Sequence, residues 1–401
     1  MNNDAVIVAA LRTPVGRFQG EMGALSAVQL GTKVVEALLA QSGVPAEAVD
    51  EIIMGQVLTA GCGQNPARQT ALKAGLPVTV SALTVNLVCG SGLKAVQLAA
   101  QSIHSGAAEV VIAGGQECMS QAPFLLGEAR QGMRFGHGQV IDSLVHDGLW
   151  DAFNNYAMGI TAENLAQRYA ISREEQDLFA MTSQRKARAA QESGRFEAEI
   201  VPVTLPARKK GVERCFRDDE QPRPDATLNA LAALRPAFID EGTVTAGNAS
   251  TLNDGAAAVL VMRRERAQKL GLPIMATIVA SATAGVDPAY MGIGPVLATR
   301  RCLQQARWPQ ESVDLIEVNE AFAAQGIAVN REMEWDTLRV NVNGGAIALG
   351  HAIGASGCRI LVTLLHEMQR QNAARGLATL CVGGGQGIAL AVARDVNSQA
   401  F

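Results

Sequence analysis

Three glycine-rich turns and one strand end carry the side chains of this sequence that could take part in catalysis. Cys89 lies in Val85–Lys94, where an apolar strand turns through Gly90 and Gly92 into a helix. At a helix N-terminus, free N–H groups and the helix dipole favour thiolate over thiol, and the same groups can hold a developing oxyanion. This context predicts an activated nucleophile. The alternative is a small residue at a tight packing point.

The other three segments offer a base, a second thiol and a polar strand end. His351 lies between glycines in residues 343–357, and imidazole is the side chain best suited to move protons near neutral pH; a hydrogen-bonded structural histidine is the alternative. Cys381 precedes Gly383–Gly385, where glycines let backbone N–H groups approach a substrate closely. Asn319 ends an apolar run, and α/β proteins place their sites at strand ends that face a crevice.

Standard cofactor and metal motifs are missing from the sequence. It has no GxxxxGK[ST], no HExxH, no EF-hand loop and no CxxC pair, and residues 383–387 are too compressed for a dinucleotide fingerprint. We therefore expect no metal and no cofactor. The seven cysteines, an odd number without a secretion signal, should be reduced thiols.

Composition indicates a compact protein without nucleic acid or membrane partners. Of 401 residues, 48% are hydrophobic and 18% charged, and 34 basic against 38 acidic residues give a net charge of −4. Neither sign forms a long block, so nucleic acid is an improbable partner. The uncharged runs contain Pro, Asn, Ser, His or Gly clusters, which favours buried strands and turns over bilayer spans. We expect a cytoplasmic protein.

An internal repeat predicts two related α/β halves. Residues 48–55 match 312–319 at an offset of 264, Ser91-Gly92 matches Ser356-Gly357 at 265, and residues 110–116 match 380–386 at 270. Each half alternates apolar runs with amphipathic segments, the pattern of helices covering a mainly parallel sheet. The middle of the chain is more charged, and Ser172 with Glu175 forms a capping box that predicts a helix running toward Gly194.

Together these segments resemble the thiolase family. The match runs along nearly the whole chain, from Arg12 through residues 63–69 to the last glycine-rich turn. Its four motifs occur in order at Asn86–Lys94, Asn319–Ala323, Gly344–Gly357 and Cys381–Gly387. Within the family, the sequence is most similar to the short-chain acetyl-CoA acetyltransferases.

The resemblance implies a reversible Claisen condensation of two acetyl-CoA to acetoacetyl-CoA and CoA. His351 would take a proton from Cys89, which would receive the acetyl group. Cys381 would deprotonate the second acetyl-CoA. One oxyanion site would combine His351 with a water held by Asn319, and the other would use the backbone N–H groups of Cys89 and Gly383.

The resemblance also implies a layered α-β-α-β-α fold with an inserted loop domain that binds CoA. The expected domains are 1–120 plus 251–272 for the N-terminal half, 121–250 for the insertion, and 273–401 for the C-terminal half. The implied CoA contacts are Arg223 at the adenine, Ser250 at the pantetheine, and Leu149, Met158 and Phe322 along the pocket; Lys209 and Lys210 are further candidates. Taken singly, Arg223 would be a solvated charge, Ser250 a turn residue, and Leu149 and Met158 core. Residues 121–142 resemble a pairing loop, which implies a homotetramer built as a dimer of dimers.

Two departures from the family pattern concern substrate range. Ala352 stands where thiolases commonly have Pro after the histidine, and Ala157 stands where they commonly have His before the pocket methionine. The nearest alternative is a degradative 3-ketoacyl-CoA thiolase of broader chain length. A cysteine hydrolase would leave Cys381 without a role, and a non-catalytic acyl-CoA carrier would have lost the catalytic side chains that are present here.

Overall fold

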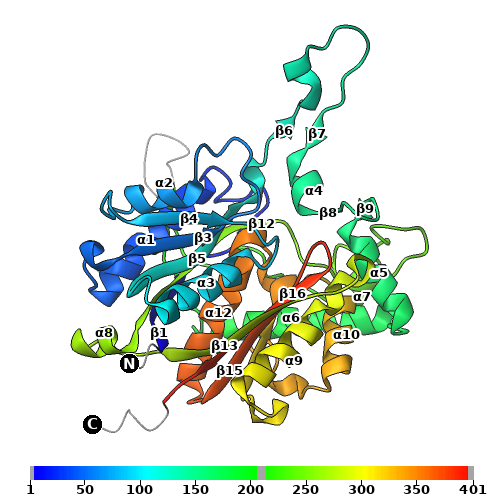
Figure 1. Ribbon diagram of the computed structural model, residues 1–401. Helices are drawn as coiled ribbons and strands as arrows, with labels where there is room; N and C mark the ends of the chain where they lie inside the picture. The colour runs from blue at the N-terminus through cyan, green and yellow to red at the C-terminus, as the bar shows by residue number, and fades with distance from the viewer. Residues whose placement is uncertain (1–3, 206–213, 396–401) are drawn as a thin grey trace.

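A mixed β-sheet runs through the centre of the molecule (Figure 1). The computed structural model describes residues 4–205 and 214–395, so Lys209 and Lys210 lie outside the described residues. The strands of the central sheet are β1 (Ala5–Arg12), β2 (Gly16–Arg17), β3 (Glu51–Gly55), β4 (Ser81–Val85), β5 (Val110–Cys118), β12 (Asn253–Arg263), β13 (Ala276–Gly285), β14 (Leu315–Val318), β15 (Arg375–Val382) and β16 (Gln386–Ala393). Their order is β14-β15-β16-β13-β1-β12-β5-β3-β4, with β2 paired to β12.

Helices form layers outside and between the two halves of this sheet. They are α1 (Ala27–Ser42), α2 (Pro66–Lys73), α3 (Ser91–Ser105), α8 (Arg264–Lys269), α9 (Gly294–Ala306), α10 (Ala323–Met333), α11 (Ala346–Leu349) and α12 (Ile353–Arg370). α1 and α2 pack on the outer face of the first half, and α9 and α10 on that of the second. α3 and α12 lie between the halves in the largest apolar core. This is the expected α-β-α-β-α order (Figure 1).

The two halves repeat one plan, but the sheet is not mainly parallel as expected. β3 pairs in parallel with β4 and β5, and β14 pairs in parallel with β15. β12 and β16, however, run antiparallel to the strands with which they pair. For the β15–β16 pair the reason is connectivity: β16 follows β15 through a short turn, and a tight hairpin forces antiparallel pairing.

The third match of the internal repeat was placed in the wrong register. β5 and β15 are equivalent strands, because Val111 pairs with Glu51 in one half and Gly376 with Leu315 in the other. That correspondence has an offset of 265, not the predicted 270. The glycines of residues 110–116 lie within β5, whereas those of residues 380–386 form the turn after β15. Similar sequences therefore occupy different structures.

The central helices cross so closely that only glycine fits at the crossing. A Cβ on Gly92 of α3 would lie 2.8 Å from the backbone nitrogen of Cys358, and one on Gly357 of α12 would lie 2.5 Å from that of Leu93. Real Cβ atoms essentially never approach so near. The halves are therefore joined backbone to backbone at the point where both helices begin.

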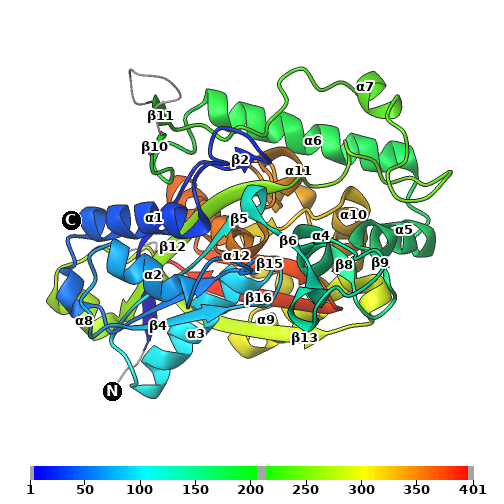
Figure 2. The ribbon, with the colours of Figure 1, turned by 90° about the horizontal axis from the view of Figure 1, so that it is seen from above.

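The segment between β5 and β12 adds several short elements. They are β6 (Phe124–Leu125), β7 (Ile141–Asp142), α4 (Ser143–Gly148), β8 (Trp150–Asp151), β9 (Tyr156–Ala157), α5 (Met158–Arg168), α6 (Arg173–Glu192), β10 (Val203–Leu205), β11 (Arg214–Phe216) and α7 (Leu228–Ala232). β6 and β7 carry an arm that projects from the body (Figure 1), with Phe124, Met133 and Phe135 exposed on it. α6 runs along one side, next to α11 (Figure 2). Its capping box at Ser172 is formed as predicted.

Candidate active site

Cys89 lies on a strained turn at the start of α3. The preceding residue, Val88, has a φ of 43°, which is an outlier for a β-branched side chain. Ser91 holds this turn, since its Oγ donates to the Val88 carbonyl (2.6 Å) and accepts from the Leu87 N–H (2.8 Å). Asn86 Oδ1 accepts from the Val88 N–H (2.8 Å). Such strain persists only where neighbours over-determine it and is concentrated at functional sites.

The expected bias toward thiolate at Cys89 is wrong for the resting protein. Burial raises the pKa of its thiol to about 11, and the charge of Glu117 acts in the same direction. Backbone N–H groups of Gly383 and of Cys89 itself hydrogen-bond the sulfur and lower its pKa, but burial outweighs them. The helix N-terminus is present as predicted. The sequence could not show how little water reaches the sulfur, and a base must therefore remove the proton.

The turn between β15 and β16 interlocks with the Cys89 turn. A Cβ on Gly90 would lie 2.8 Å from Val382 Cγ2, and one on Gly383 would lie 3.2 Å from Val88 Cγ1. Cys381 is buried near the end of β15, and burial followed by the nearby Cys89 raises the pKa of its thiol. The structure thus brings both cysteines and Gly383 together.

The hydrogen bonds of His351 determine which of its nitrogens carries the proton. Nδ1 lies 2.6 Å from Ser356 Oγ, and that hydroxyl donates its one hydrogen to the Ala352 carbonyl (2.8 Å). Ser356 must therefore accept from Nδ1–H, which leaves Nε2 unprotonated and able to accept a hydrogen bond or a proton. Burial and then the Arg359 charge lower the pKa of His351 to about 4. The imidazole is neutral at physiological pH, in the form that can accept a proton.

Asn319 reaches the same imidazole from the strand end. Its Nδ2 lies 3.5 Å from His351 Nε2, while its buried Oδ1 has no partner among the described residues. The next residue, Glu320, fixes this segment, since its carboxylate accepts from Ser183 Oγ (2.6 Å) and Asn341 Nδ2 (3.0 Å). The strand end is therefore rigid and presents an amide to His351.

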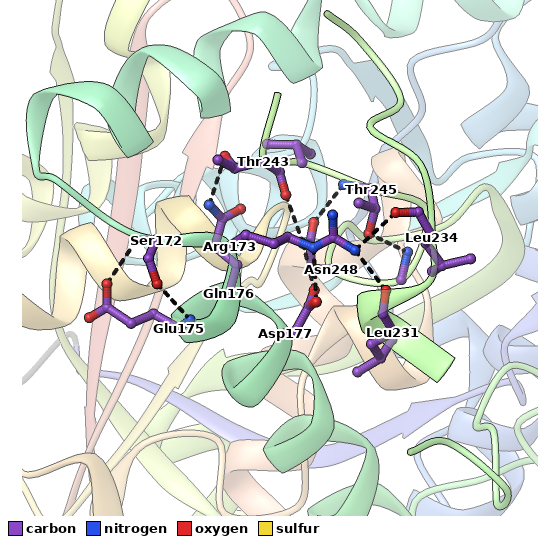
Figure 3. Close-up of polar contacts among 12 residues, drawn as sticks. Ser172, Arg173, Glu175, Gln176, Asp177, Leu231, Leu234, Thr243, Thr245 and Asn248 are labelled. Carbon is purple, nitrogen blue, oxygen red and sulfur yellow. Dashed lines mark hydrogen bonds and ion pairs between the residues drawn. The ribbon is translucent and has the colours of Figure 1, made fainter. Parts of the chain in front are cut away.

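Helix α6 positions the loop that carries Ser250 (Figure 3). Arg173 bonds the carbonyls of Leu231 and Leu234 and pairs with Asp177, whose other oxygen accepts from Asn248 Nδ2 (2.9 Å). The Asn248 carbonyl then accepts from Ala323 N–H (2.8 Å), and Ser250 N–H donates to the Ala321 carbonyl (2.9 Å). The Ser250 loop is thereby tied to the Asn319 segment.

The predicted pocket residues fall into two groups. Met158 and Phe322 pack with Met291, Ala321 and Cys381, and Leu149 packs on the cluster that Cys89 also contacts. Arg223 differs, because its side chain is exposed and its backbone N–H donates to Gln184 Oε1 (2.9 Å). No described contact joins the Arg223 side chain to the two cysteines.

Three further residues shape the site without having been singled out for it from the sequence. Ser356 orients His351, and Asn253 Oδ1 accepts from the His351 backbone N–H (2.9 Å). Glu117 accepts from Val57 N–H (3.0 Å) and Gly354 N–H (2.9 Å), and burial raises its pKa to about 7. Ser356 was visible as the repeat partner of Ser91, and each serine ties a helix to the catalytic turn before it. Asn253 and Glu117 carried no such signal.

The described part of the chain offers no group of three or more His, Cys, Asp or Glu side chains placed to hold a metal ion. In the same residues no helix is long and apolar enough to cross a bilayer. All seven cysteines are free thiols, as their odd number predicted.

Comparison with known proteins covers both halves of the chain. The family models described as "Thiolase, N-terminal domain" and "Thiolase, C-terminal domain" match residues 5–265 and 272–394. The acetyl-CoA acetyltransferase of Pseudomonas aeruginosa is 64% identical over 392 residues, which cover 98% of this chain and 100% of that protein. The crystal structure of the Bacillus anthracis acetyl-CoA acetyltransferase matches with a TM-score of 0.95 at 46% identity, covering 97% of this chain and 98% of that one. The crystal structure of human mitochondrial 3-ketoacyl-CoA thiolase matches with a TM-score of 0.95 at 40% identity, covering 98% and 100%.

Proposed function

Because the chain belongs to the thiolase family, as its four motifs predicted, we propose that it is an acetyl-CoA C-acetyltransferase that condenses two acetyl-CoA to acetoacetyl-CoA and CoA. One observation carries the proposal: the half-buried thiol of Cys89, which receives two backbone N–H groups, lies beside the buried thiol of Cys381. A hydrolase would need only one of these thiols. A neutral imidazole with a free Nε2 completes the set.

The first half of the reaction transfers an acetyl group to Cys89. His351 Nε2 takes the thiol proton as the sulfur attacks the acetyl carbon, and the carbonyl oxygen becomes an oxyanion. CoA leaves as a thiolate. The neutral Cys381 gives its proton to that leaving sulfur, so that CoA departs as a thiol and Cys381 becomes a thiolate base.

The second half forms the carbon–carbon bond. The Cys381 thiolate removes a methyl proton from the second acetyl-CoA, and the resulting enolate attacks the acetyl group on Cys89. Acetoacetyl-CoA forms as the Cys89 sulfur leaves and recovers its proton from His351. Every proton returns to its starting residue.

Two sets of donors serve the two oxyanions. The backbone N–H groups of Cys89 and Gly383 already hydrogen-bond the Cys89 sulfur and would hold the oxyanion that forms on the acetyl group. His351 and a water on the unpartnered Oδ1 of Asn319 would hold the enolate oxygen. The reaction uses side chains and thioester substrates, with no further cofactor.

CoA would lie along the inserted loop domain, residues 121–250. The N-terminal half would be residues 1–120 plus 251–272, and the C-terminal half residues 273–401. Met158, Phe322 and Leu149 would line the acyl and pantetheine path, since they pack beside the cysteines. Ser250 would bond the pantetheine. Arg223, whose side chain is exposed, would meet the adenine end in solvent.

The exposed arm supports a homotetramer. Phe124, Leu126, Met133, Phe135 and Val140 all lie exposed on residues 124–140, and a projecting apolar arm marks a contact with another copy. The protein would work in the cytoplasm. Sedimentation of the purified chain tests the tetramer, and a monomer at micromolar concentration would contradict it.

The direct test is CoA-dependent cleavage of acetoacetyl-CoA by the purified protein, with a longer 3-ketoacyl-CoA measured in parallel. Rapid turnover of the short substrate alone supports the acetyltransferase. Cleavage of both would favour a degradative 3-ketoacyl-CoA thiolase, the function named for the human structure that matches equally well in fold. Cys89→Ala should abolish turnover, while the exposed Cys215→Ala should not.

Ala157 provides a test of chain length. It is the N-cap of α5, directly before the pocket residue Met158, and makes no side-chain capping bond. Ala157→His adds a polar ring at the pocket wall and should lower KM for acetoacetyl-CoA or narrow the chain-length profile. Unchanged KM and an unchanged profile would exclude Ala157 as a determinant of substrate range.

A further inference from the structure

A small cavity lies on the Nδ1 side of His351, behind Ser356, whereas Asn319 lies on the Nε2 side. Ala352, Ser356 and Arg359 of the His351 segment line it, together with Thr13 and Gly255 of the neighbouring strands. Its volume is about 10 Å³, which matches the space that one water needs. Because Ser356 also bonds His351 Nδ1, the cavity is one side chain removed from the catalytic base.

The guanidinium of Arg359 is buried next to this cavity without a partner. Arg359 is 4% exposed, and its Nη1 and Nη2 make no hydrogen bond within the described residues. It follows Ser356 by three positions on α12, so both side chains lie on one face of the helix. Arginine keeps its charge in proteins, and a buried charge needs compensation.

The acids around Arg359 are mostly engaged elsewhere. Glu199 and Asp219 bond Arg12 at 2.6 and 2.7 Å. The remaining acid is Glu317 of β14, which interacts with Arg359 electrostatically and whose Oε2 also lacks a partner among the described residues. Burial raises the pKa of Glu317 to about 8, so this acid is mostly protonated at neutral pH and compensates the guanidinium only in part, while Nη1 and Nη2 of Arg359 have no partner among the described residues.

We propose that Arg359 is a positioning residue for His351, acting through one water bound against Ser356 in this cavity. The guanidinium donates to the water, and the water donates to the remaining lone pair of Ser356 Oγ. That oxygen then has no lone pair left for any donor other than Nδ1–H, so the proton is fixed on Nδ1 and Nε2 stays free. The role as base belongs to the proposed function, on which this inference rests.

The charge of Arg359 supports the same outcome. The carboxyls on neighbouring segments bond other groups, Glu117 the Gly354 N–H, Asp254 the Ser120 N–H and Glu320 the Ile347 N–H, and none of them is a cause of the His351 pKa shift. After burial, Arg359 is the group that lowers the pKa of His351. A cation held two side chains away disfavours imidazolium and so maintains the neutral base.

The test compares three variants with the full-length wild-type protein. Arg359→Met is made together with Glu317→Gln, because removing the cation alone would leave the buried carboxyl uncompensated. Arg359→Lys retains the charge. Arg263→Gln is the matched control, since Arg263 also has an unpartnered buried Nε but lies at the far end of β12, about 30 Å from Asn253 and His351.

Two measurements separate this inference from the proposed function. The first is NMR titration of histidine labelled with 13C at the ε1 position, tractable because the chain has five histidines. In the double variant, the His351 titration should move toward higher pH by about one pH unit, with Arg359→Lys and Arg263→Gln close to wild type. The second is the acid limb of the kcat/KM profile for acetoacetyl-CoA cleavage, which should move by the same amount.

An unmoved His351 titration in the folded double variant would overturn the proposal, even if kcat fell. If the wild-type protein cleaved no acetoacetyl-CoA, the proposed function would fail, yet the NMR titration would still decide whether Arg359 acts on His351. If the double variant does not fold, Arg359→Gln with Glu317→Gln replaces it. The amide keeps a polar group at the cavity but removes the cation, so the His351 titration should again move toward higher pH, and an unmoved titration would overturn the proposal.

Discussion

Cys89 and His351 are both neutral groups in the resting protein. Burial raises the pKa of the thiol to about 11 and lowers that of the imidazole to about 4, so a resting ion pair between them is strongly disfavoured. The thiolate must therefore form as the thioester is attacked, when the N–H groups of Cys89 and Gly383 can stabilise the charge that develops. Premature reaction of the thiol with other electrophiles is thereby suppressed.

Ser356→Ala should reduce kcat for acetoacetyl-CoA cleavage by about 10- to 100-fold, part of the ~10²–10⁴ that a positioned base contributes. The variant removes the acceptor of Nδ1–H, so the proton can move to Nε2 and block the base. Ser356→Thr retains the hydroxyl and serves as the control. Equal rates for Ala and Thr variants would show that the hydroxyl does not orient the imidazole.

Asn319→Ala should lower kcat by about 10²–10³-fold, the usual loss of one oxyanion donor. Its amide is buried beside His351, so the thermal melt should be followed as well. Asn229→Ala, on the exposed face of α7, is the control. Wild-type turnover in Asn319→Ala would remove this side chain from the reaction.

At the scale of elements, the nucleophile Cys89 and the base His351 each stand just before a helix whose first turn is bonded by a serine. Ser91 bonds the Val88 carbonyl ahead of α3, and Ser356 bonds the Ala352 carbonyl ahead of α12. The turn before α12 ends at Ala352, with a φ of −73° that proline adopts without strain.

Ala352→Pro should raise the free energy of unfolding by about 0.4–1 kcal/mol, because proline restricts the unfolded chain. Denaturant unfolding monitored by circular dichroism gives the change. A lower midpoint would mean that the Ala352 N–H contributes a bond to the neighbouring Leu252 segment, with which residue 351 forms a bridge.

The sequence predicted those features that depend on local pattern. Each of these features is determined by fewer than about 20 neighbouring residues: the helix start after Cys89, the capping box of α6, and the segments of the first two repeat matches. The pairing of β12 with β5 could not be predicted, since at least 136 residues separate the paired positions, as between Asp254 and Cys118. The direction of the Cys89 pKa shift was predicted wrongly for a related reason: Cys89 packs against apolar clusters that include Val382 and Ile353, which are distant in the chain.

At the scale of the molecule, buried acids should make stability depend on pH. Burial raises the pKa of Glu117 to about 7 and of Glu317 to about 8, from an ordinary value of 4.5. The folded protein then binds more protons than the unfolded chain, so these groups destabilise it progressively as pH rises from about 4.5 to 8. His351 has the opposite effect in a lower pH range. Burial lowers its pKa from 6.5 to about 4, so its contribution to stability is lost as pH falls from 6.5 through about 4.

Above pH 6.5 the two acids therefore act unopposed by His351. The free energy of unfolding should decrease by about 1–2 kcal/mol between pH 6.5 and 8, given 1.36 kcal/mol per pH unit for one proton. Glu317→Gln should flatten this slope, whereas Glu311→Gln, at an exposed position, should not. A stability that rises over the same interval would show that these carboxyls are ionised at little cost.

The crossing of α3 and α12 makes each half a structural prerequisite for the other. The nucleophile precedes one helix and the base precedes its partner, and Gly92 and Gly357 bring the two backbones into contact between them. Neither half can bury its inner face alone, because the central core draws on both helices and both groups of strands. Although the chain is built as a duplication, it should unfold as one cooperative unit, and neither half should survive as a folded fragment.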